Sequence, residues 1–202
     1  MEFYYILAVI SAGFIAPLLF SLLFGVGYFG LSKVFLGLLL FLASFILAYL
    51  FSRVLAVVGV SGVLFCCIMG LLVAVSQRVL VALGVNGLEA SEAVWVGFGF
   101  GLAETICSLI PNAPIHLIFA GSALTHFYRR LMSSLFQAAS AMVLSRTSLY
   151  KLAVLSAAQA IGFSIALAGS YGFIQAPSII QHIIEAGVLA SPLAMMHSSV
   201  HS

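Results

Sequence analysis

The stretch VGFGFGLAETICSLIPN, residues 96–112, is uncharged except for one carboxylate, Glu104. Gly97, Gly101 and Glu104 follow one another at spacings of four and three, which place them on one face of a helix. Glycines at such positions allow a neighbouring membrane helix to approach closely. We therefore expect a buried helix that delivers its carboxylate into a tight helix contact and not into lipid.

The composition of the whole chain indicates an integral membrane protein. The 202 residues are 64% hydrophobic and 6% charged, whereas a soluble domain carries about 25% charged residues. A net charge of +2 gives no indication of a nucleic-acid partner. The start, MEFYYILAVI, has an acidic residue and no basic one, so we expect a retained first span and not a cleaved signal peptide. The expected partner is the lipid bilayer, and the expected location is the cell membrane.

Apolar stretches that approach the roughly 20 residues needed to cross a bilayer occur six or seven times. They are residues 3–24, 34–51, 60–83, 90–110, 128–144 and 149–168, and then 173–195, which is either a seventh span or an amphipathic surface helix. The expected fold is an all-α bundle of 6–7 transmembrane helices in one domain, residues 1–202.

Four local features refine these boundaries. Pro17 is expected to kink the first span, and Arg53 to end the second. Asn86 and Glu89 have the spacing of a capping box before the fourth span. Residues 115–127 are either a re-entrant piece or the front of a longer helix.

Polar side chains inside the apolar stretches are the candidate functional residues. A charge in hydrocarbon costs about 2.5–3.5 kcal/mol on insertion scales, so such groups face the bundle interior. Four expected helices offer them: Arg78, Glu104, Arg130 with Gln137, and Gln159. One interpretation is a common polar site. The other is ordinary interhelical hydrogen bonding, at about 0.6–2 kcal/mol per bond.

The cysteines and histidines add no metal or cofactor motif. The three cysteines lie in apolar runs and are expected to pack as small hydrophobic side chains. His116 and His126 are ten residues apart, which is no ligand spacing, and the pair in HSSVH, His197 and His201, is typical of a polar chain end.

The order of these motifs resembles the YhfC-like family of polytopic membrane proteins, which are grouped with glutamic-type intramembrane peptidases. GFGFGLAE, residues 97–104, resembles the family's glycine–glutamate helix, with Phe100 at a position that is often His or Trp. YLFSR, GLLVAVSQRVLVAL, YRRLMSSLFQAAS and LSAAQAIGFS fit further motifs in order and spacing, so the resemblance covers residues 11–164.

The resemblance implies a proteolytic site in the bilayer, with glutamates that activate water and histidines that assist. This sequence departs from that pattern at the reactive groups. Ala74 and Val75 replace a glutamate pair, Arg129 replaces another glutamate, and Gln137 and Gln159 stand where histidines are expected. Glutamine cannot transfer a proton. We expect Glu104 to meet Arg78 or Arg130 across the glycine contact. A carboxylate beside arginine is stabilised in its charged form and is a poor base.

Three functions remain open from the sequence. The first is a family relative that has lost peptidase chemistry and binds a transmembrane peptide or a lipid through Arg78, Arg130, Gln137, Gln159, Gly97 and Gly101. The second is an active peptidase with Glu104 as its catalytic base. The third is a small-solute transporter subunit, because arginines and glutamines in a bundle interior suit an anionic or amide-bearing solute. One PNAP break and no internal repeat weigh against the third.

Overall fold

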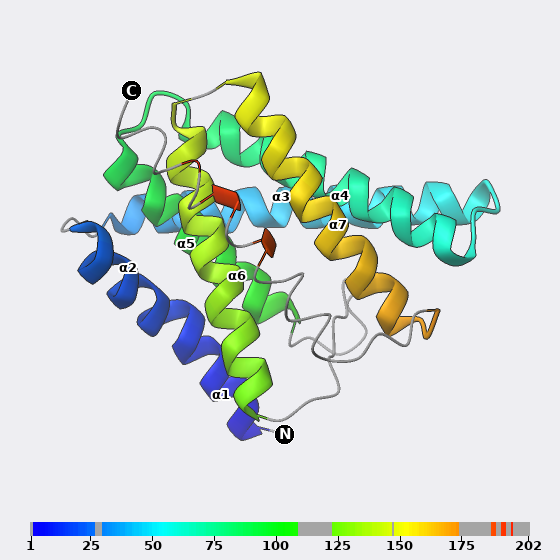
Figure 1. Cartoon of the computed structure of the whole chain (residues 1–202), viewed down its shortest axis with the longest axis horizontal. Coiled ribbons are helices and arrows are strands. Elements are labelled where there is room, and N and C mark those ends of the chain that lie inside the picture. The colour runs from blue at the N-terminus through cyan, green and yellow to red at the C-terminus, as the bar shows by residue number, and fades with distance from the viewer. Residues whose placement is uncertain are drawn as a thin grey trace.

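The chain folds into helices that cross one another at several angles (Figure 1). The computed structural model describes residues 2–26, 30–108, 123–146 and 148–173, together with Gly187, Val188, Ser191, Pro192 and Met195. The elements are α1 (Glu2–Ile10), the π-helical turn η1 (Ser11–Ile15), α2 (Ala16–Phe24), α3 (Leu31–Val57), α4 (Gly62–Val85), α5 (Ala90–Ser108), α6 (Ala123–Leu144) and α7 (Leu149–Ser170). No strand occurs in these ranges, so the all-helical class is confirmed for them.

Four helical segments are long and apolar enough to cross a membrane. They are Ile6–Phe24, Leu31–Val57, Gly62–Val85 and Leu149–Gly169. The expected count of 6–7 spans is not confirmed, because α5 and α6 do not reach the same hydropathy within the described ranges. Of the expected last segment, residues 173–195, Phe173 and five isolated positions are described, and Gln181, His182 and Glu185 lie outside the described residues.

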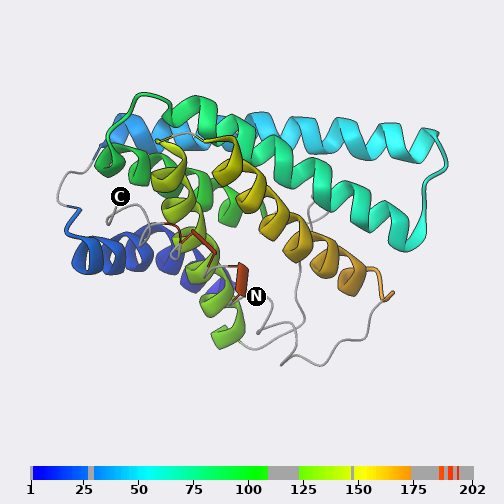
Figure 2. The same cartoon turned by 45° about the horizontal axis from the view of Figure 1, so that its top comes forward.

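Helix α5 is the central element of the bundle. Every residue from 93 to 101 is buried, and the helix packs between α3 and α6, with α1, η1 and α4 also in contact with it. In Figure 2, α3 lies above this helix and α1–α2 lie below it. Helix α5 is therefore surrounded by protein, and it needs little apolar surface of its own for lipid.

The three alternating glycines of α5 make this enclosure possible. A Cβ atom at Gly97 would overlap the backbone of Gln137 in α6, and one at Gly101 would lie 3.0 Å from the Cα of Ser134. Gly99 lies on the opposite side, where a Cβ atom would overlap the carbonyl of Val34 in α3. The expectation that Gly97 and Gly101 allow close approach is confirmed, and Gly99 adds a second close contact on the other face.

Two predicted interruptions take a different form in the structure. Pro17 has no N–H, and it follows the π-helical turn, in which the Ala16 N–H donates to the Ser11 carbonyl. Helix α3 continues past Arg53 to Val57, so the prediction that Arg53 ends it is wrong. Arg53 is part of the helix, and its side chain contacts Tyr49 one turn earlier. Its Nε donates to the Tyr49 hydroxyl at 3.0 Å, and its Cζ lies 5.1 Å from the Tyr49 ring centroid.

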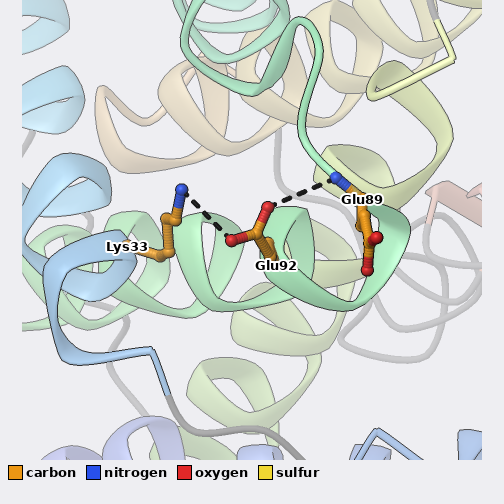
Figure 3. Close-up of polar contacts among 3 residues, drawn as sticks. All are labelled: Lys33, Glu89 and Glu92. Carbon is orange, nitrogen blue, oxygen red and sulfur yellow. Dashed lines mark hydrogen bonds and ion pairs between the residues drawn. The ribbon is translucent and has the colours of Figure 1, made fainter.

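The predicted capping box before α5 is displaced by three residues. Asn86 is the C-cap residue of α4 and not the N-cap residue of α5. The hydrogen bond typical of a capping box instead joins Glu89 and Glu92, where the Glu92 carboxylate accepts from the Glu89 N–H at a long 3.4 Å. The other oxygen of Glu92 lies 3.3 Å from the Lys33 Nζ of α3 (Figure 3). This ion pair joins the first turns of α3 and α5. Helix α6 begins at Ala123, so the end of segment 115–127 is the front of a longer helix, and residues 115–122 lie outside the described residues.

Candidate functional site

The Glu104 side chain faces α6 across the glycine contact. It is half-buried, and its Oε2 atom accepts a 2.9 Å hydrogen bond from the Nε2 atom of Gln137. Gln137 belongs to the polar stripe of α6, where Ser134, Gln137 and Ser140 recur every third residue and are all buried. The missing side chains at Gly97 and Gly101 leave the space in which the carboxylate and the amide meet.

Gln137 also contacts the arginine of α4. Its Oε1 atom accepts a hydrogen bond from the Nη2 atom of Arg78. The amide thus turns its oxygen to the cation and its nitrogen to the carboxylate, which is the orientation that both charges favour. Three helices are joined in one row, Arg78–Gln137–Glu104, and we call this row the polar relay.

Arg78 is the deepest member of the polar relay. Its side chain is fully buried, and its Cζ atom lies 5.2 Å from the ring centroid of Phe136 and 6.0 Å from that of Phe100. Both rings are within the range of a cation–π interaction. Within the described ranges, the Nε and Nη1 atoms donate to no acceptor. Phe100 and Phe136 were not expected as partners of Arg78, because the sequence does not show which faces of α5 and α6 meet α4.

The expected direct contact between Glu104 and a guanidinium is replaced by this relay. Among the described residues, the ion pair with atoms within 4.0 Å joins Lys33 and Glu92. Arg78 and Glu104 still interact electrostatically, but through the intervening amide. The reason is the length of the glutamine side chain, which fills the space between the two charges. Arg130 is buried as well, on α6 and two turns before Gln137.

A second amide pair lies between α4 and α7. The Nε2 atom of Gln159 donates to the Oε1 atom of Gln77 at 2.5 Å, and both side chains are buried. Helices α4 and α7 approach closely at Gly70, where a Cβ atom would lie 2.9 Å from the Ser164 backbone nitrogen. Gln159 was predicted to face the interior, but its partner Gln77 was not named. Adjacent residues such as Gln77 and Arg78 point about 100° apart on a helix, so α4 presents one polar group to α7 and the other to α6.

The arrangement suits binding or bracing better than proton transfer. Its groups are a hydrogen-bonded carboxylate, amides that neither gain nor lose protons, and a guanidinium that stays charged. The described ranges hold no group of three His, Cys, Asp or Glu residues that could bind a metal ion. His116, His197 and His201 and the side chain of His126 lie outside the described residues. Comparison with known proteins finds no matching family model, no matching curated protein and no matching solved structure.

Proposed function

We propose that this chain is a polytopic helical protein of the cell membrane that binds a transmembrane peptide or a lipid at its polar relay and does not hydrolyse peptides. In this proposal it is a relative of the YhfC-like intramembrane peptidases that kept the glycine–glutamate helix and lost the reactive groups. The proposal includes six or more crossings, with α5 and α6 spanning the bilayer inside a wall of the four apolar segments.

The observation that carries this proposal is the pairing of Glu104. Hydrolysis by a glutamate requires a carboxylate that is free to take a proton from water, and a proton donor for the leaving amine. The neighbour of Glu104 is an amide, 2.9 Å away, and beyond it is a guanidinium. Neither group can pass a proton at neutral pH. Glu104 is half-buried, and Arg78 lies beyond Gln137 on its buried side. The carboxylate is therefore placed to accept a hydrogen bond from a donor group of a ligand.

Burial of the polar relay supports the same conclusion. Gln137 and Arg78 are buried, and their hydrogen bonds join α4 to α6 and α6 to α5. A preformed, rigid polar group inside an apolar bundle can recognise a partner at little ordering cost. The active-peptidase alternative predicts a free base at Glu104, and its hydrogen bond to Gln137 argues against one.

The test uses the whole protein reconstituted in liposomes with a fluorescently labelled transmembrane peptide. We expect no cleavage by the natural chain, by Glu104→Gln or by the matched control Glu89→Gln, which changes an acid outside the polar relay. We also expect native mass spectrometry of the reconstituted protein to show retained lipid or peptide. Cleavage that is present in the natural chain and in Glu89→Gln, and absent in Glu104→Gln, would overturn the proposal.

A further inference from the structure

The unpaired N–H groups of Arg78 indicate which chemical group this side chain can bind. A guanidinium has five N–H groups. Nη2 carries two of them and donates a hydrogen bond to Gln137. The Nε and Nη1 atoms, which carry three N–H groups, are buried and have no hydrogen-bond partner among the residues that the structure describes. A buried cationic donor without an acceptor is more costly than a neutral one in the same position.

Two hydroxyls on α6 are also available as donors. The hydroxyls of Ser134 and Ser140 are buried on the same face of α6 as Gln137, and in the described part of the chain neither has a hydrogen-bond partner. A hydroxyl can donate to an anion as well as accept. The Oε1 atom of Gln159 is an unpaired acceptor, but its amide already belongs to the pair with Gln77. The unpaired cationic donors in this set belong to Arg78, and the two hydroxyls can donate to the same anion.

The carboxylate of this chain does not supply what Arg78 lacks. Glu104 accepts its hydrogen bond from Gln137, and the amide of Gln137 lies between this carboxylate and the Arg78 guanidinium. The Phe100 and Phe136 rings offer only the weaker attraction of their faces. A guanidinium is best matched by a planar or tetrahedral oxyanion that can accept two of its N–H groups.

We propose that Arg78 is the oxyanion-binding residue of this protein, and that it takes the carboxylate or phosphate group of its ligand, assisted by the hydroxyls of Ser134 and Ser140. The proposal rests on the proposed binding function and names its ligand chemistry. The oxyanion can belong to a small soluble acid or to the head of a lipid or fatty acid. Both present the same acceptor atoms to the guanidinium.

The experiment measures thermal unfolding of the full chain in a neutral detergent, by the fluorescence of its single tryptophan, which is buried in α5. The probes are butyrate and inorganic phosphate for soluble acids, and decanoate for lipid-borne acids. Decanol, which has the same tail without the charge, is the matched neutral probe. A ligand at a hundredfold excess over its Kd stabilises the folded state enough to raise Tm by about 5–10 °C in a chain of this size.

We expect an acid-dependent rise in the natural chain and in the control Arg53→Gln, no rise with decanol, and no rise with any acid in Arg78→Gln. A rise with butyrate or phosphate identifies a soluble acid, and a rise with decanoate alone identifies a lipid-borne one. If Arg78→Gln does not fold, saturable binding of radiolabelled decanoate or phosphate to the natural chain, with no saturable binding of decanol, decides the question.

The proposal is overturned if no acid stabilises or binds the natural chain, or if Arg78→Gln responds as the natural chain does. These outcomes are separate from failure of the proposed function. Peptide cleavage that depends on Glu104 would overturn the non-catalytic function and leave the oxyanion measurement intact. Absence of acid binding would remove the ligand chemistry and leave the absence of cleavage unaffected.

Discussion

Replacement of Gln137 by leucine is the most direct test of the polar relay. The change keeps the approximate volume of the side chain and removes two hydrogen bonds, one to a cation and one to an anion. Hydrogen bonds to charged groups contribute about 1.5–3 kcal/mol each, which gives about 3–6 kcal/mol for the pair. Measured interhelical bonds in membranes are weaker and average about 0.6 kcal/mol. We expect about 3 kcal/mol, because the variant leaves the fully buried Arg78 with no polar partner among the described residues.

The matched control is Gln159→Leu, which removes a buried amide bonded to another neutral amide, Gln77. A neutral pair contributes about 1 kcal/mol. At about 2–4 °C per kcal/mol for a chain of this size, Gln137→Leu should lower Tm by about 6–12 °C and Gln159→Leu by about 2–4 °C. Both are measured by tryptophan fluorescence during heating in the same detergent.

A double-mutant cycle separates the relay from simple loss of packing. Adding Arg78→Leu to Gln137→Leu removes the cation that the first change leaves unpaired, and buried charges replaced by apolar groups are often tolerated. We expect the double variant to be more stable than Gln137→Leu alone. Equal losses for Gln137→Leu and Gln159→Leu, together with additive effects in the cycle, would refute the reasoning that the amide joins two charges.

Three further predictions concern other parts of the bundle. Gly99→Ala places a methyl group against the α3 backbone and should lower the free energy of unfolding by more than about 2 kcal/mol. In Gly162→Ala the new methyl group lies 3.5 Å from a side chain, so this variant should be neutral or gain up to about 1 kcal/mol from helix propensity. Thermal unfolding curves of the two variants test this difference. Lys33→Gln removes an ion pair with Glu92 whose partners are 24% and 31% exposed, so it should lower stability by at most about 1 kcal/mol, and by less at high salt. Cys67 is exposed on α4, a candidate span, so in liposomes it should not react with a charged maleimide, and labelling by that reagent would place this part of α4 outside the bilayer.

The sequence was sufficient to predict the close packing of α5, but not the hydrogen-bond partner of its Glu104. Gly97 and Gly101 could be assigned to one close helix contact because helical spacing alone determines a shared face. The identity of the facing residues depends on the rotation and depth of α6, which no spacing within α5 contains. For that reason Glu104 was expected beside a guanidinium, and the amide between them was not foreseen. Gln77 was missed in the same way, since its partner is 82 residues away.

The boundaries show a second limit of sequence reasoning. The charge of Arg53 predicts the end of the second span, but α3 continues to Val57, and the hydroxyl of Tyr49, one turn earlier, accepts a hydrogen bond from Arg53. Such local compensation depends on rotamers, which the apolar pattern does not specify. The capping residue of α5 was misplaced by three positions because an acidic residue follows at the same spacing at both candidate starts.

The low hydropathy of α5 and α6 follows from their position and explains where this protein can keep polar groups. Helices at the lipid boundary must be apolar on their outer face, and α3, α4 and α7 carry many exposed large hydrophobic side chains. Helix α5 contacts lipid hardly at all if the bundle spans a bilayer, because residues 93–101 are buried within the protein. Glycines on both faces of α5 bring α3 and α6 close to its backbone, and this enclosure is what allows a carboxylate, an amide and a guanidinium to lie in one row. A bundle without those glycines would hold its helices farther apart, and Gln137 could not reach both charges.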